Sequence, residues 1–266
     1  MGADAICRIP TFDFSGSTLY VEPFLPLDSA PSASLRLTSD PARVDPENRL
    51  LWRMNRRRLE GEALWDAMHS VAGTLNPKMG GRPIMPPLAE EELSALRERH
   101  NWVVPEDPAE HTRRGVYLLV RRNFRFPFFE AFDAPVNSVS CPRRDVTTVA
   151  PQALWFLNNR TSLAQATHMA ARVVQECRAG GGPPVGVTEE SSAWVKRAWQ
   201  LALGREPTGD ERDEVVRLLK SLSQPGAGAP LQDPPAVLKS LPPERAAALV
   251  KLCLAVFNLN EFLFVD

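Results

Sequence analysis

The sequence has few of the residues on which metal and haem sites depend. Its four cysteines, at positions 7, 141, 177 and 253, are scattered and include no C-x-x-C pair. Zinc knuckles and covalent haem attachment both require such a pair. The histidines are His69, His100, His111 and His168. Their spacing allows neither HExxH nor an i, i+4 pair of ligands. We therefore expect no metal site and no cofactor in this chain. One or two disulfides remain open, although buried, reduced roles for Cys177 and Cys253 are the simpler interpretation.

Long apolar runs and an excess of one charge are also lacking. No uninterrupted apolar run reaches the ~18 residues of a membrane helix, so no membrane insertion is expected. Residues 1–10 have neither the charged start nor the apolar stretch of a signal peptide. With 31 Lys and Arg against 32 Asp and Glu, the formal net charge is −1. Proteins that coat nucleic acid carry a basic excess, and no nucleic-acid partner is predicted.

Catalytic and phosphate-binding motifs are absent from the sequence. The serine that follows Gly16 lies in an irregular region and has no strand-to-helix elbow to expose it as a nucleophile. The glycines at 80–81 and 180–182 fit neither G-x-G-x-x-G nor G-x-x-x-x-G-K. They are more typical of turns. No catalytic residue is assigned, and an enzymatic role for this chain alone is not predicted.

The chain divides by composition into a leader and a domain. Prolines at 10, 23, 26, 31 and 41 interrupt residues 1–45, which show little periodicity. We interpret residues 1–45 as an irregular leader or linker. Residues 46–266 have enough apolar content for a substantial core, and although two small domains are possible, one large domain is favoured.

Helical signals dominate residues 46–266. The first helix is predicted from a cap at Asp45 to a stop at Gly73, with apolar residues spaced by three and four. It would carry Arg56, Arg57 and Arg58, and because three successive residues fan around a helix, at least one of these arginines should be buried and paired.

Further helices are expected in the second half of the chain. They would run from Thr147 or Thr148 with Pro151 in the first turn, over 162–175, from Thr188 to Gly204, from a capping box of Thr208 and Glu211, and over 243–257. The run GVYLLV at 115–120 is predicted as a strand, although a helical segment is also possible. The fold class is therefore mainly α, a multi-helix domain with long irregular loops and little or no strand.

A phenylalanine cluster and an arginine cluster are the main candidates for core and site. Phe126, Phe128, Phe129 and Phe132 should pack against Trp52 or Leu59 and against Leu254, Phe257 or Phe262. The candidate site comprises Arg56, Arg57, Arg58, Arg121, Arg122, Arg143, Arg144, Gln152, Asn158 and Asn159.

Guanidinium groups suit the recognition of carboxylate, sulfate or phosphate. The same arginines could instead be internal clamps that pair with Glu130, Asp133 or Asp145. We therefore keep two interpretations of the candidate site, a ligand site and a structural cluster.

Several separated motifs point to one family. They are LLWRMNRRRLEGEAL, VYLLVRRNFRFPFFEAFDAP, SCPRRDVTTVAPQAL, RAWQLALGREPTGDE and the terminal FNLNEFLFVD. Together they resemble the planctomycete-specific C-terminal "PSD" domain, a domain-of-unknown-function family, number fifteen fifty-three in its series. The resemblance covers residues 46–266. It implies that the chain is a fragment, the end of a longer exported, periplasmic or cell-surface protein, with c-type haem possible in an upstream cytochrome domain.

These observations lead to two functional hypotheses. The first is a non-catalytic structural or partner-docking module of a larger, exported, cytochrome-associated protein, with the upstream domains as its partners. The second is an accessory domain of a carbohydrate-active protein, which would bind an anionic glycan through the Arg and Asn cluster.

Overall fold

The computed structural model describes residues 40–88, 90–94, 102–122, 124–136, 138–179, 186–224 and 231–265. The chain divides into two compact units, residues 1–52 and 53–266. In the described part of the first unit, the Asp40 side chain caps the short helix α1 (Pro41–Val44) by accepting a hydrogen bond from the Ala42 amide. The end of the expected leader is thus helical for one turn.

The helix predicted from Asp45 to Gly73 is wrong in its first part. The Asp45 carboxylate accepts hydrogen bonds from the amides of Arg49 and Leu50, at 2.9 and 2.7 Å. A helix N-cap would instead bind amides two or three residues ahead. Asn48 and Leu51 have φ angles of 55° and 56°, which are left-handed and end any right-handed helix. Residues 45–52 therefore form turns.

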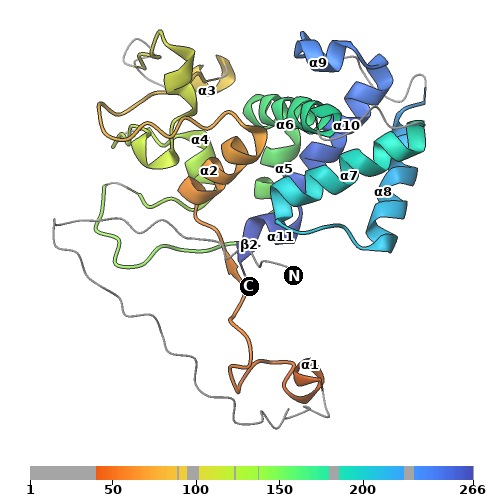
Figure 1. Cartoon of the computed structure of the whole chain (residues 1–266). Coiled ribbons are helices and arrows are strands. Elements are labelled where there is room, and N and C mark those ends of the chain that lie inside the picture. The colour runs from red at the N-terminus through yellow and green to blue at the C-terminus, as the bar shows by residue number, and fades with distance from the viewer. Residues whose placement is uncertain are drawn as a thin grey trace, which may run out of the picture. The chain divides into compact units, whose positions relative to one another are not determined.

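The second unit begins with strand β1 (Arg57–Arg58) and helix α2 (Gly61–Ala72) (Figure 1). α2 ends at Gly73, as predicted, and Gly73 takes the left-handed φ of 76° that only glycine adopts without strain. The helix buries Leu64, Trp65 and Met68. On the same face, the ring of His69 packs on Trp65 with centroids 4.2 Å apart.

Short helices and loops follow α2. They are α3 (Glu90–Ser94), η2 (Pro108–Thr112), η3 (Gly115–Tyr117) and α4 (Pro127–Ala131). The strand predicted over residues 115–120 is wrong at residues 115–117, where the Tyr117 amide donates to the Arg114 carbonyl and the Leu118 amide to the Gly115 carbonyl, closing a 3₁₀ turn. Beyond this turn, Leu118 forms an isolated parallel β-bridge with Ile84. Arg113 stabilises the loop at residues 78–82, because its buried guanidinium donates hydrogen bonds to the carbonyls of Lys78, Gly80 and Arg82.

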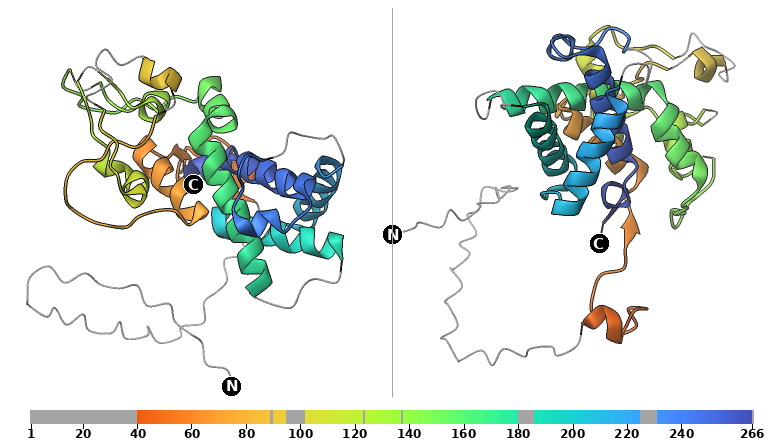
Figure 2. Two further views of the ribbon diagram at one scale, coloured as in Figure 1. Left: turned by 90° about the horizontal axis from the view of Figure 1, so that it is seen from above. Right: turned by 90° about the vertical axis from the view of Figure 1, so that its right-hand side faces the viewer.

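The second half is helical, as predicted. Its elements are α5 (Ala150–Asn158), α6 (Arg160–Ala179), α7 (Val187–Leu203), α8 (Gly209–Leu222), α9 (Ala236–Lys239), α10 (Pro243–Phe257), α11 (Asn260–Leu263) and strand β2 (Phe264–Val265). Helix α6 runs through the middle of the unit and packs against α2, α5, α7 and α10 (Figure 2).

Several predicted helix ends are confirmed. Gly204 stops α7 with a φ of 69°, and Thr208 and Glu211 form the reciprocal capping box of α8. The predicted cap of α5 is wrong. Neither Thr147 nor Thr148 caps it, because Val149 occupies the cap position and Thr147 donates to Asp133 instead. The predicted glycine turn at 180–182 lies outside the described residues.

One aromatic core joins the two ends of this unit. Phe126, Phe128, Phe129 and Phe132 are all buried, as predicted. Phe128 and Phe132 contact Phe156 of α5, which contacts Phe257 of α10, and Phe257 contacts Phe262. Trp65, Trp102 and Trp155 contact these phenylalanines. Trp52, which was predicted to pack there, is 40% exposed, and Leu59 packs against the hydrophobic core as a whole.

The fold class is mainly α. In the part of the chain that the structure describes, the only sheet is the antiparallel pair of β1 and β2. Within the same residues, no helix has both the length and the apolar character to cross a membrane. Cys141, Cys177 and Cys253 are free thiols, and Cys253 is fully buried.

Candidate anion-binding site

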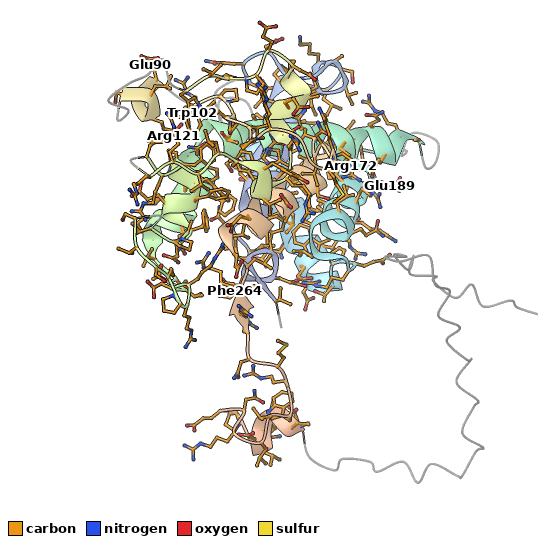
Figure 3. All side chains as sticks on the ribbon, turned by 90° about the vertical axis from the view of Figure 1, so that its left-hand side faces the viewer. Glu90, Trp102, Arg121, Arg172, Glu189 and Phe264 are labelled. Carbon is orange, nitrogen blue, oxygen red and sulfur yellow. The ribbon has the colours of Figure 1, made fainter. Side chains whose placement is uncertain are left out.

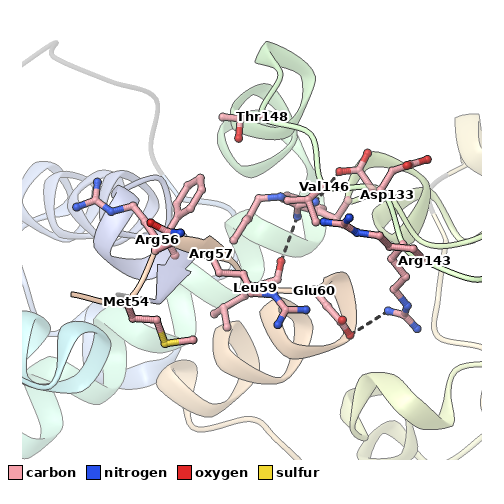
Figure 4. Close-up of a pocket in the computed structure, with 15 residues that line it drawn as sticks. Met54, Arg56, Arg57, Leu59, Glu60, Asp133, Arg143, Val146 and Thr148 are labelled. Carbon is pink, nitrogen blue, oxygen red and sulfur yellow. Dashed lines mark hydrogen bonds and ion pairs between the residues drawn. The ribbon is translucent and has the colours of Figure 1, made fainter. Parts of the chain in front are cut away.

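A cavity of about 990 Å³ lies beside β1. It is lined by residues 54–60, by Phe132 and Asp133, by residues 143–146 and 148, and by Phe264 (Figure 4). Five of the ten residues predicted from the sequence line it, namely Arg56, Arg57, Arg58, Arg143 and Arg144. Segments that are about ninety positions apart in the chain are thus brought together around one cavity.

Pairing of the two strands sets the direction of the first arginines. Arg57 lies opposite Val265 and Arg58 opposite Phe264, and the Leu59 amide donates to the Leu263 carbonyl at 2.8 Å. Successive side chains of a strand point to opposite faces. Arg58 is therefore buried while Arg57 is exposed. The prediction that one of the three arginines is buried and paired is confirmed, although strand alternation rather than a helix explains it.

Arg58 forms a buried clamp with Asp133. Its Nη2 lies 2.5 Å from Asp133 Oδ2, and its Nε donates to the Thr147 carbonyl at 3.0 Å. The Thr147 amide and hydroxyl both donate to the same carboxylate, at 2.8 Å. Gln152 donates to the Ala131 carbonyl at 3.1 Å and approaches Asp133 at 3.4 Å. This clamp joins β1 to the end of α4 and to the segment that precedes α5.

Arg144 is held by a second, more exposed clamp. Its Nη1 and Nη2 donate to the two carboxylate oxygens of Glu62 at 2.8 and 3.0 Å, and Nη1 also reaches Glu60 at 3.1 Å. Burial alone would raise the pKa of Glu62, but the hydrogen bonds from Arg144 outweigh it and the pKa is lowered. The bond to Glu62 likewise raises the pKa of Arg144. Both groups therefore stay charged at neutral pH.

Arg57 and Arg143 differ from these two clamps. Both side chains are exposed and line the cavity, and among the described residues neither guanidinium has a carboxylate or carbonyl partner. The lining holds five arginines against the carboxylates of Glu60, Asp133 and Asp145. Glu60 and Asp133 already bind Arg144 and Arg58. The cavity lining therefore carries an excess of positive charge, and the guanidinium groups of Arg57 and Arg143 are available to an anion.

The other predicted site residues lie outside the cavity lining. The Gln152 side chain donates to the Asp133 carboxylate and so takes part in the Arg58–Asp133 clamp. The side-chain amide of Asn158 donates to the Leu154 carbonyl. The side chain of Asn159 donates to Glu92 and accepts a hydrogen bond from the Thr161 backbone amide. Figure 3 shows Arg121 near Trp102 and well away from Phe264. Arg122 follows Arg121 in the chain and is exposed.

Two acidic residues define the site as much as the arginines do. Asp133 was among the clamp partners that the sequence suggested. Glu62 was not among the suggested partners, yet it binds Arg144. No local pattern links residues 62 and 144, so only the tertiary structure reveals this pair.

A metal centre is not found in the described residues, where no group of three or more His, Cys, Asp or Glu side chains could hold an ion. A family model, PSD1, protein of unknown function (DUF1553), matches residues 32–219, which is more than half of the chain. No curated protein and no solved structure gives a significant match.

Proposed function

Because the chain belongs to the PSD1 family of unknown function (DUF1553), we propose its role from the site itself: a non-catalytic docking module whose arginine cavity receives an anionic group of a partner. The observation that carries the proposal is the pair of exposed guanidinium groups at Arg57 and Arg143. Both line the cavity, and neither has a partner among the described residues.

The neighbouring clamps support this role because they order the backbone around both residues. Arg57 precedes Arg58, whose side chain is 3% exposed and bound to Asp133. Arg143 precedes Arg144, which Glu62 holds through two hydrogen bonds. A site whose backbone is already ordered loses less conformational entropy when a ligand binds. Guanidinium forks also match the geometry of carboxylate, sulfate and phosphate groups.

The same chemistry favours binding over catalysis. Arginine stays protonated throughout the physiological range, so it is poorly suited to give or take a proton. Two of the three lining carboxylates, those of Glu60 and Asp133, are engaged by arginines. A cavity of this kind suits recognition of a charged group rather than its conversion.

For the partner we propose a neighbouring region of the same longer protein. The family resemblance suggests an exported protein in which cytochrome-associated domains precede this one. Any haem would then belong to the partner and not to this chain.

The test is binding of two anionic probes, a short acidic peptide and a sulfated oligosaccharide, measured by calorimetry at two salt concentrations. The Arg57→Glu, Arg143→Glu double variant should bind at least about tenfold more weakly, since hydrogen bonds to charged groups contribute ~1.5 to 3 kcal/mol. Arg122→Glu is the matched control, because Arg122 is exposed and lies outside the cavity. Equal binding by both variants, or no binding of either probe to the native protein, would refute the proposal.

A further inference from the structure

A second cavity adjoins the arginine cavity at β2. Its volume is about 740 Å³, and helices α7, α8 and α11 contribute to its lining together with Phe264 and Val265 of β2 (Figure 1). Arg56 and Phe264 line both cavities. Because the two cavities share lining residues, they are neighbours, and one ligand can extend from the first into the second.

The second cavity has the opposite charge excess. Its lining holds three carboxylates against two arginines. Arg205 donates to Glu211 at 2.8 Å and to Glu261 at 2.6 Å, and Arg56 takes part in an interaction of its own. Glu214 of α8 is exposed, and among the described residues no partner binds its carboxylate. Glu214 is therefore the charged group of this cavity that is available to a cation.

The apolar part of the second cavity suits the stem of a long basic side chain. Trp199, which is 5% exposed, lines it together with Val215 and Leu259. Lysine and arginine lay their methylene stems along apolar surfaces and keep the charged end at a polar rim. The Nε1–H of Trp199 has no acceptor among the described residues. Its resonance should therefore report what enters the cavity.

We propose that the two cavities together bind one extended segment of a partner protein, with carboxylates at one end and a Lys or Arg at the other. The carboxylates bind Arg57 and Arg143, and the basic side chain binds Glu214. This inference rests on the proposed function and goes further, because it assigns a mixed-charge peptide rather than a glycan as the ligand. A uniformly anionic ligand that extended into the second cavity would bring negative charge beside Glu214, which is unfavourable.

The experiment compares synthetic peptides by calorimetry at low salt. The mixed peptide joins a Glu block to a Lys block through a short or a longer flexible spacer, in both orders. One matched peptide has Gln in place of Lys, and another has Glu there. The best mixed peptide should bind the native protein about fivefold more tightly than its Gln form, which is the upper range for an exposed ion pair. It alone should shift the indole N–H resonance of Trp199, which is identified by its loss in Trp199→Phe.

Charge reversal on the protein locates the basic side chain. Glu214→Lys should remove the advantage of the mixed peptide and give it to the peptide that has Glu in place of Lys. A variant that had merely lost structure would not gain affinity for a new ligand. Asp210→Lys is the matched control, because Asp210 is exposed on the same helix and lines neither cavity. This control should give the native result.

The outcomes separate this inference from the proposed function. The second contact is overturned if the mixed and Gln peptides bind alike, or if the advantage of Lys survives Glu214→Lys or is also lost in Asp210→Lys. The anion site stands in each of these cases as long as binding depends on Arg57 and Arg143. If the sulfated oligosaccharide binds through these arginines and no peptide does, the peptide assignment is overturned. If no anionic probe binds the native protein, both proposals fail.

Discussion

The guanidinium of Arg58 and the carboxylate of Asp133 lie 2.5 Å apart, although 75 residues separate them in the chain. The Arg58 side chain is 3% exposed and that of Asp133 17%. Asp133 also has a left-handed φ of 60°, an unusual conformation for a residue other than glycine. The pair therefore fixes both the strand that carries Arg57 and the turn after α4.

Replacing Arg58 should destabilise the domain strongly. Arg58→Ala leaves the Asp133 carboxylate without its buried partner, which typically costs about 3 to 5 kcal/mol in the free energy of unfolding. Arg57→Ala is the matched control, and because that side chain is exposed it should change stability by no more than about 0.5 kcal/mol. Urea denaturation of both variants measures the difference. Equal midpoints would show that the buried pair contributes nothing.

Adding a methyl group at Gly115 should also destabilise the fold. A Cβ there would lie 2.9 Å from Glu62 Cα and 3.0 Å from the Glu62 carbonyl oxygen, too close for helix α2 to remain in place. Gly115→Ala should therefore cost about 1 to 3 kcal/mol, as overpacking does. Gly209→Ala is the control, since a Cβ at Gly209 meets nothing within 4 Å. A melting temperature of Gly115→Ala that matches the control would contradict the close approach.

The aromatic core should respond to a single truncation in α5. Phe156 is fully buried and contacts Phe128, Phe132 and Phe257. Phe156→Ala should lower the free energy of unfolding by about 3 to 5 kcal/mol. The next residue, Leu157, is 51% exposed, so Leu157→Ala should have a small effect. Loss of only the C-terminal elements in Phe156→Ala, with the rest unfolding at the native midpoint, would argue against one shared core.

Acid should destabilise the protein through His69. Burial lowers the pKa of this histidine from 6.5 to about 4, and its Nδ1 lies 2.9 Å from the Trp65 carbonyl oxygen. The unfolded chain binds a proton below 6.5 that the folded chain does not, so stability falls as pH falls from 6.5 toward about 4. The loss should be of the order of 3 kcal/mol.

A pH series of urea unfolding curves tests this expectation. His69→Gln should remove most of the slope in that window, whatever its effect on absolute stability. His168→Gln is the control. His168 is exposed, and its like charge is the smallest of the causes that lower the pKa of His69, so most of the slope should remain. An unchanged slope in His69→Gln would assign the acid sensitivity to other groups.

Structure that depends on local interactions could be predicted from the sequence, and structure that depends on long-range contacts could not. Helices such as α8 and α10 were predicted because their capping and periodicity are local. The helix predicted from Asp45 failed because that carboxylate closes a turn onto Arg49 and Leu50 instead of capping. Apolar spacing alone does not make a helix where the apolar residues stay exposed, as Leu50 does at 76%.

The sequence predicted several of the residues that form the candidate site, but not which of them meet in the structure. The arginines at 56–58 and 143–144 were recognised, yet their meeting depends on the contact of Arg58 with Asp133 and of Arg144 with Glu62. Such long-range pairs leave no periodic signal. Arg121 belongs to one of the family motifs and Asn159 follows another closely in sequence, yet both lie outside the cavity lining in the structure.

The most direct test of the anion site is an NMR titration that observes the arginine side chains. With the short acidic peptide as the probe, the Nε–Hε resonances of Arg57 and Arg143 should shift together and saturate. The signals of Arg58, already bound to Asp133, and of Arg122, outside the cavity, should move little. Saturating shifts at both cavity arginines would support the account. Shifts that are absent, or that are as large at Arg122 as at Arg57 and Arg143, would contradict it.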